Sequence, residues 1–200
     1  MRDNKQTLRA RALIKRESLP VSDVRAWSHL IQERVLDFPP YVLAPAAALY
    51  SPIGNEVATE EIRDHSLRVG KKVFYPKVGK GEELFLIRVR SAEELKPGRY
   101  RILEPVGTEV MTEQDQQGLV VFVPGLVFDL EGERLGRGRG GYDRLLARLA
   151  EGVTFISLAY EFQIIEELPT EKWDRKVHHI ITERRTIDCG DFTPRSDGVS

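Results

Sequence analysis

The sequence has little cysteine and almost no net charge. Cys189 is its single cysteine, so it can neither close an internal disulfide nor supply a cysteine metal cluster, which favours a reducing compartment, the cytoplasm. Thirty basic and 31 acidic residues leave a formal charge of −1. No overall field would therefore draw the protein onto nucleic acid or an anionic membrane, and any anion site must be local.

A long hydrophobic run is also missing. The longest run, GLVVFVPGLVF, is interrupted by Pro124 and Gly125 and falls short of the roughly 20 residues that a membrane helix requires. The N-terminal stretch MRDNKQTLRARALIKRE is charged throughout and lacks the apolar core of a secretory signal. Neither membrane insertion nor export is expected.

The chain also lacks internal repeats and linkers rich in proline or glycine. Its composition, 41% hydrophobic and 30% charged, is typical of an ordinary globular protein. We therefore predict one domain over residues 1–192. The remainder, residues 193–200, has nothing to bury and is predicted to be a flexible tail.

Hydrophobic periodicity predicts an α/β fold. Apolar residues at helical spacing predict one helix over residues 4–18 and a second from about Ser22 or Asp23 to Pro39 and Pro40. Short apolar segments then alternate with helical ones, including a helix from Thr59 to Gly70, which is typical of parallel strands with helical crossovers. The expected strands are AAALY, KKVFYP, ELFLIRV, GLVVFVP, VTFISLAY and, as the last, HHIIT. A further helix is expected over RGGYDRLLARLAE. The predicted fold is a mixed, largely parallel sheet flanked by helices.

The strongest local signal is VPGLVFDLEGERLGRGRGGYDRLLA, in which a buried strand leads through a glycine-rich loop into a helix. Glycine allows backbone amides to approach a phosphate, and the amides at a helix start carry partial positive charge. Guanidinium groups match phosphate oxygens in a two-pronged geometry. The segment supplies both kinds of group: Gly136, Gly138, Gly140 and Gly141, with Arg134, Arg137, Arg139 and Arg144.

Other interpretations of this segment remain open from the residues alone. Asp143 could cap the helix, or it could hold a magnesium ion that binds phosphates. The loop could be a surface turn with solvated arginines. It could also be an arginine-glycine RNA-binding segment, although such segments normally repeat within disordered sequence and this one occurs once.

The same segment resembles the signature of the 5-formyltetrahydrofolate cyclo-ligase family, also called methenyltetrahydrofolate synthetase. The shared pattern is a strand, PG, an apolar pair, FD, RLG, a glycine-rich run and YDR. Three more segments agree in order and spacing: KQTLR, NEVATEEI and YEFQIIEELPTEKWDRKVHHIIT. The resemblance covers nearly the whole chain and implies a three-layer fold like that of the ribose-phosphate isomerase and coenzyme A transferase group.

The resemblance implies an enzyme that uses ATP and magnesium to convert 5-formyltetrahydrofolate into 5,10-methenyltetrahydrofolate, releasing ADP and phosphate. The protein would be a monomer whose partners are ATP and a reduced folate. Catalysis would involve Arg137 and Lys5, Glu56 would contact the pterin, and Asp143 and Asp174 would hold magnesium. The residues expected to bind ATP are Lys5, Arg9, Arg134, Leu135, Gly136, Arg137, Gly138, Arg139, Gly140, Gly141 and Tyr142. The residues expected to bind the folate are Glu56, Arg137, Gly138, Arg139, Gly140 and Gly141.

One position departs from the family pattern. The family reads GYYD where this chain reads GGYD, so Gly141 stands in place of a tyrosine that packs against the folate. This favours an alternative, a non-catalytic or altered-substrate paralogue that binds nucleotide or folate on the same scaffold. Trp173, beside Asp174, could pack near the nucleotide or lie in a polar loop.

Overall fold

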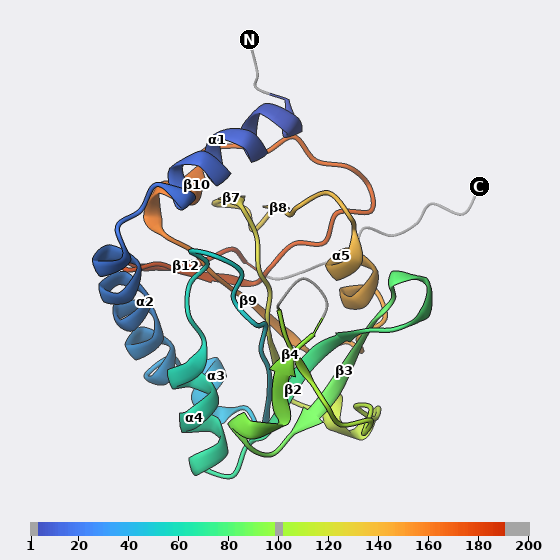
Figure 1. Cartoon of the computed structure of the whole chain (residues 1–200). Helices are drawn as coiled ribbons and strands as arrows, with labels where there is room; N and C mark the ends of the chain where they lie inside the picture. Colours follow the sequence, from blue (N-terminus) through green and yellow to red (C-terminus); the bar gives the residue numbers. More distant parts are fainter. Residues whose placement is uncertain (1–3, 99–101, 191–200) are drawn as a thin grey trace, which may run out of the picture.

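The main sheet of the protein has seven strands and lies at the centre of the fold (Figure 1). The computed structural model describes residues 4–98 and 102–190. The strands run in the order β12 (Thr186–Asp188), β11 (His179–Ile181), β9 (Thr154–Leu158), β6 (Leu119–Phe122), β1 (Ala46–Ala48), β2 (Lys72–Val78) and β3 (Leu84–Val89). The five inner strands are parallel to one another, and the edge strands β12 and β3 are antiparallel to their neighbours. The predicted α/β class with a mixed, largely parallel sheet is confirmed.

Helices cover both faces of this sheet. On one face lie α2 (Val21–Leu36), α3 (Pro39–Leu43) and α4 (Glu60–Arg68), and on the other lies the short α5 (Gly141–Leu146) (Figure 1). Successive side chains of a strand point to opposite faces, which divides the core in two. Val73 and Val120 pack on the side of α2 and α4, whereas Phe74 and Val121 pack on the side of α5.

The N-terminal helix packs on a second, smaller sheet. This sheet consists of β10 (Ile164–Ile165), β7 (Val127–Asp129) and β8 (Arg134–Leu135). Helix α1 (Lys5–Glu17) packs on it through Leu8, Ala12 and Leu13, which meet a third apolar cluster around Leu126. The first turn of α1 therefore lies beside the loop that follows β8.

The remaining elements are short. They are the hairpin β4 (Leu95–Pro97) and β5 (Leu103–Pro105) and the 3₁₀ turns η1 (Lys80–Glu82), η2 (Ala92–Glu94), η4 (Gln114–Gln116) and η5 (Glu161–Gln163). Among the residues described, no helix has the length and apolar character needed to cross a bilayer.

Three sequence-based predictions about these elements were wrong. Helix α2 begins at Val21, without a side-chain cap, because the fixed φ of Pro20 already suits a helix start. Helix α2 ends at Leu36, before Pro39 and Pro40 as predicted, and these two prolines begin α3. Helix α5 stops at Leu146, where hydrogen bonds to the third preceding residue replace the α-helical pattern. HHIIT is not the last strand, because the chain turns back after Thr182 to form β12.

The domain boundaries and the fold name stay predictions. The single domain predicted for residues 1–192 is not tested, nor is the likeness to the ribose-phosphate isomerase and coenzyme A transferase group. The predicted tail, residues 193–200, lies outside the described residues.

Candidate active site

A cavity of about 370 Å³ opens at the carboxyl ends of the parallel strands. Tyr50, Pro76 and Pro124 border it from the ends of β1, β2 and β6. The start of α1, the loop between β8 and α5 and the segment around Asp174 complete its wall. Ligands of open α/β sheets bind at this end of the strands, so the cavity is the natural candidate site.

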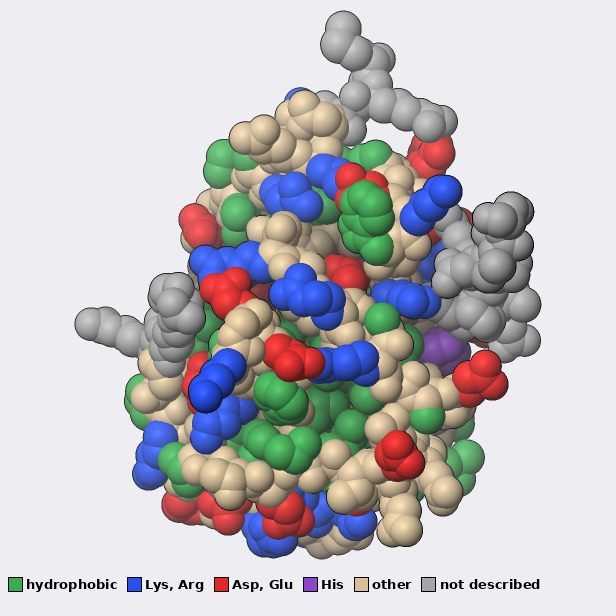
Figure 2. Space-filling view, turned by 90° about the vertical axis from the view of Figure 1, so that its right-hand side faces the viewer, with side chains coloured by type: hydrophobic (Ala, Val, Ile, Leu, Met, Phe, Trp, Pro, Cys, Tyr) green, Lys and Arg blue, Asp and Glu red, His purple; other side chains and the backbone are tan. Residues whose placement is uncertain are grey.

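The cavity has a charged part and an apolar part. In Figure 2, Lys and Arg side chains gather beside a hollow whose floor is formed by hydrophobic side chains. The lysines and arginines of its lining are Lys5, Arg9, Arg134, Arg137, Arg139 and Arg144, and its apolar wall includes Tyr50, Ile53, Pro76, Val78, Leu84 and Leu103. Such a lining suits a ligand with an anionic end and a flat, apolar end.

The loop between β8 and α5 bends around the cavity because its glycines permit it. Gly138 and Gly140 have φ angles of 92° and 63°, a region that side chains disfavour. A Cβ atom at Gly138 would lie 3.5 Å from Cζ of Arg9, whose Nε donates a hydrogen bond to the carbonyl of Gly136 at 2.9 Å. The first helix therefore holds the loop beside the cavity, while Arg137 and Arg139 remain 45% and 67% exposed.

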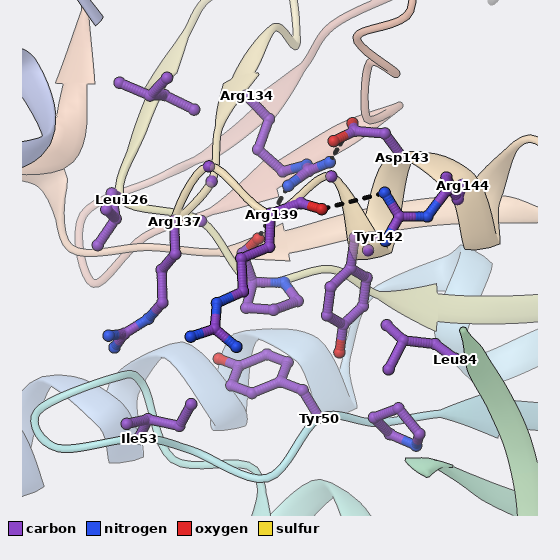
Figure 3. Close-up of a pocket in the computed structure, with 18 of the residues that line it drawn as sticks. Tyr50, Ile53, Leu84, Leu126, Arg134, Arg137, Arg139, Tyr142, Asp143 and Arg144 are labelled. Atoms are coloured by element: carbon purple, nitrogen blue, oxygen red, sulfur yellow. Dashed lines mark hydrogen bonds and ion pairs between the residues drawn. The ribbon is translucent and has the colours of Figure 1, made fainter. Parts of the chain in front are cut away.

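Arg134 and Asp143 form a buried ion pair at the back of this loop (Figure 3). Nη2 of Arg134 lies 2.6 Å from Oδ1 of Asp143, which also accepts a hydrogen bond from the amide of Arg175 at 3.3 Å. Burial lowers the pKa of Arg134, although an arginine remains charged. Asp143 accepts no bond from an amide of α5 among the described residues, so the interpretation of Asp143 as a helix cap is wrong.

Lys5 and Asp174 meet across 169 positions of the sequence. Nζ of Lys5 donates to Oδ2 of Asp174 at 2.7 Å and lies 3.0 Å from Oε2 of Glu171. Burial alone would lower the pKa of Lys5, but the hydrogen bonds and charges of these two carboxylates outweigh it and raise the pKa. Lys5 is therefore a firmly charged ammonium group at the cavity wall.

Glu56 is buried on the opposite side of the cavity and is bound through both oxygens. Oε1 accepts hydrogen bonds from Nη2 of Arg137 and from Nη2 of Arg16, each at 3.2 Å. Oε2 accepts one from the amide of Ile53 at 3.0 Å. The predicted catalytic arginine thus contacts the predicted pterin-binding glutamate directly.

Two tyrosines stand beside Glu56. Burial, followed by the negative charge of Glu56, raises the pKa of both Tyr50 and Tyr142, so both phenols stay protonated near neutral pH. Tyr50 donates its hydrogen bond to the carbonyl of Val57 at 2.9 Å. Figure 3 shows the ring of Tyr142 projecting toward Tyr50.

The structure brings every predicted site residue to this one cavity. The lining contains Lys5, Arg9, Glu56, Arg134, Leu135, Gly136, Arg137, Gly138, Arg139, Gly140, Gly141, Tyr142, Asp143 and Asp174. Sequence reasoning missed the apolar wall, because Pro76, Leu84 and Leu103 belong to strands and gave the pattern of core residues. It also missed Arg16, whose contact with Glu56 no local pattern indicates.

The fold and the cavity define an α/β protein whose ligand site combines a glycine-arginine loop with an apolar wall. The model of the 5-formyltetrahydrofolate cyclo-ligase family matches residues 1–183, well over half of the chain. The chain therefore belongs to the 5-formyltetrahydrofolate cyclo-ligase family, a family of ligase enzymes.

Individual relatives agree with this assignment. The chain is 29% identical to the 5-formyltetrahydrofolate cyclo-ligase of Mus musculus, over 90% of this chain and 93% of the mouse protein. It is 32% identical to that of Escherichia coli K12, over 74% of this chain and 84% of the relative. The NMR structure of the Aquifex aeolicus 5,10-methenyltetrahydrofolate synthetase superposes with a TM-score of 0.81 at 34% identity, covering 98% of this chain and 99% of the other.

Proposed function

We propose that the protein converts 5-formyltetrahydrofolate into 5,10-methenyltetrahydrofolate with consumption of ATP and release of ADP and phosphate. One observation carries the proposal: a cationic glycine loop and a buried carboxylate face each other across a single cavity and touch through Arg137 and Glu56 at 3.2 Å. A nucleotide with its phosphates at one end of this cavity and a reduced folate with its pterin at the other would place their reacting groups beside Arg137. We further propose that the protein acts as a cytoplasmic monomer.

The chemistry explains why such a site needs cations. The carbonyl of a formamide is a poor electrophile because the nitrogen lone pair is delocalised into it, so its oxygen must become a leaving group. Transfer of the terminal phosphoryl group of ATP to the formyl oxygen achieves this. Nitrogen-10 then attacks the formyl carbon and releases its proton, after which the carbon–oxygen bond breaks and phosphate departs with the oxygen. The protein contributes positioning and stabilisation of the charge on the phosphoryl oxygens.

The charged part of the cavity suits the nucleotide phosphates. Lys5, Arg9, Arg134, Arg139 and the amides and glycines of residues 135–141 would hold them, with Lys5 and Arg137 nearest the transferred group. Among these side chains, Arg137 is 45% exposed and pairs with Glu56 from the cavity side, whereas Arg134 is 3% exposed and is fixed by Asp143. Arg137 is therefore our choice for stabilising the transferring phosphoryl group.

Asp143 and Asp174 would hold magnesium together with the phosphates. In the part of the chain that the structure describes, one oxygen of each carboxylate accepts hydrogen bonds and the other accepts none. No group of three or more His, Cys, Asp or Glu residues there could hold a metal alone. This fits magnesium, which is commonly bound by one or two carboxylates plus water and substrate phosphates. When bound, the ion would neutralise phosphate charge.

Glu56 and the apolar wall suit the reduced folate. The carboxylate of Glu56 would accept hydrogen bonds from the amino and ring nitrogen donors of the pterin, a pairing that rejects analogues without them. Arg137, Gly138, Arg139, Gly140 and Gly141 would line the folate from the loop, and Tyr142, expected to contact the nucleotide, borders the same cavity. A Cβ atom at Gly141 would meet only Leu84, at 3.5 Å, among nearby atoms.

The lack of a side chain at Gly141, where a Cβ atom would make an ordinary contact with Leu84, supports the second candidate. This candidate is a paralogue that acts on an altered substrate or binds its substrate without reaction. An assay that separates the two mixes the protein with 5-formyltetrahydrofolate, ATP and magnesium and follows the near-ultraviolet absorbance of the methenyl product. We expect a signal that requires ATP and disappears with a magnesium chelator. A flat trace from protein that still binds ATP by calorimetry would favour the paralogue over the enzyme.

Trp173 offers a direct test of nucleotide binding. Its side chain is 67% exposed at the cavity rim, whereas Trp27 is partly buried and packs 5.6 Å from the ring of Tyr160. We expect ATP to quench Trp173 fluorescence, and replacement by alanine to weaken ATP binding by about tenfold, since stacking on a base contributes about 1–3 kcal/mol. Titration of Trp27→Phe should show the same quench as the wild type. A quench retained in Trp173→Phe would exclude this indole as the reporter.

A further inference from the structure

A buried arginine lies behind Glu56, outside the lining of the cavity. Arg16, near the end of α1, is 3% exposed, and its Nη2 donates to Oε1 of Glu56 at 3.2 Å. Its Nη1 reaches the carbonyl of Gly125 at 3.5 Å, in the turn after β6, and its Nε is buried without a partner among the described residues. Burial of a charged group with an unmet donor costs free energy that an apolar side chain at this position would not cost.

Helix α1 and the turn that contains Glu56 each contribute a side chain to the contact between them. The side chain of Arg16 binds Glu56, and Nδ2 of the adjacent Asn55 donates to the carbonyls of Arg16 at 3.0 Å and Leu19 at 3.3 Å. The amide of Ile53 holds the other oxygen of Glu56 at 3.0 Å. The carboxylate is therefore fixed by a backbone amide and by Arg16, which does not line the cavity.

The two arginines on Glu56 differ in what a ligand would do to them. The side chain of Arg137 is 45% exposed and approaches Oε1 from the cavity, so a pterin bound to Glu56 would take its place. Arg16 approaches from behind and would stay. A carboxylate paired with Arg137 alone would lose its charge partner, and its orientation, at the moment of binding.

We propose that Arg16 is the positioning residue that holds the carboxylate of Glu56 in the orientation that the pterin of the reduced folate requires. This inference rests on the proposed function. Arg16 touches neither substrate, so it acts on binding of the folate alone. The nucleotide end of the cavity, around Lys5, lies at the first turn of α1, whereas Arg16 lies in its last turn.

The test compares Arg16→Gln, Arg16→Lys and the wild type by calorimetric binding of 5-formyltetrahydrofolate without nucleotide. We expect about a 30-fold weaker affinity for Arg16→Gln, the scale of one charge-assisted hydrogen bond, and partial recovery in Arg16→Lys. The KM for ATP, and kcat at saturating folate, should each change by less than about threefold. The variant loses folate binding to the same extent in the ground state and in the transition state, which leaves kcat unchanged. In a Glu56→Gln background, Arg16→Gln should cause little further loss.

Arg34→Gln is the matched control. Arg34 is a partly buried helical arginine that binds two backbone carbonyls, those of Thr182 at 3.2 Å and Glu183 at 3.3 Å. Neither Arg34 nor these two residues line the cavity. This substitution should leave folate affinity unchanged. Equal folate affinity in the wild type and Arg16→Gln would overturn this inference but not the proposed function. The same conclusion would follow if the soluble, folded Arg16→Lys variant lost kcat and ATP binding to the same extent as folate affinity. Absence of folate binding by the wild type would overturn the proposed function as well.

Discussion

Replacement of Arg137 with alanine is expected to lower kcat by about 10³-fold, the scale measured when one group that stabilises transition-state charge is removed. The side chain is 45% exposed and its partner Glu56 keeps its bond to Arg16, so the loss of this one contact leaves no buried charge alone. The free energy of unfolding should therefore change by less than about 1 kcal/mol. Steady-state formation of the methenyl product and a thermal melt measure the two quantities.

The size of the effect on kcat separates a catalytic arginine from a merely cationic one. Arg137→Lys should keep part of the charge but lose the two-pronged contact with phosphoryl oxygens, leaving activity between the wild type and the alanine variant. Arg184→Ala is the control, because this exposed arginine pairs with Glu183 and does not line the cavity. A loss of less than about tenfold in Arg137→Ala would contradict a role at the transferred group.

The elements of the fold were largely predictable, because strong periodicity is a local property. The buried strand β6 and the helix α1 follow from runs of residues whose spacing alone indicates strand or helix. β12 was missed because three residues with one buried side chain, Ile187, give no period to detect. The early end of α5 was missed because the residues beyond it continue an apolar spacing that tertiary packing does not use.

The candidate site was predictable to a different degree in each of its parts. The glycine-arginine loop is contiguous and has a chemical signature of its own. Lys5, Glu56 and Asp174 were expected only through the resemblance to a family, since the contact of Lys5 with Asp174 joins residues that lie 169 positions apart. Arg16 and the apolar wall were not foreseen. Charge and hydrophobicity in a sequence do not state which distant side chains will face one another.

The pairs around the cavity also differ in what their loss would do to the protein. Arg137 lies on the cavity side of Glu56, so its removal should lower kcat strongly and the free energy of unfolding only slightly. Glu56 lies between an exposed and a buried guanidinium, and its removal affects both. A substitution at Glu56 therefore has two signatures that can be measured separately.

Glu56→Gln should raise the KM for 5-formyltetrahydrofolate by about 100-fold while the KM for ATP stays near its original value. An amide keeps one acceptor but replaces the other with a donor, which would face the donors of the pterin, and a site built for hydrogen bonding discriminates strongly against such mismatches. The same change leaves Arg16 buried without its negative partner, so the free energy of unfolding should fall by about 2 kcal/mol. In a chain of this size, that corresponds to a melting temperature lower by roughly 4–8 °C.

Glu161→Gln separates these two effects. Glu161 is likewise a partly buried carboxylate paired with an arginine, Arg185, at 2.7 Å, and it also accepts a hydrogen bond from Thr182, but it does not line the cavity. It should lower the melting temperature and leave the KM for the folate unchanged. If Glu56→Gln lowered the melting temperature without changing the KM for the folate, Glu56 would serve only to neutralise Arg16. The pterin would then be recognised elsewhere along the wall. A buried carboxylate that binds a ligand cannot be replaced by an amide without a change in the affinity for that ligand.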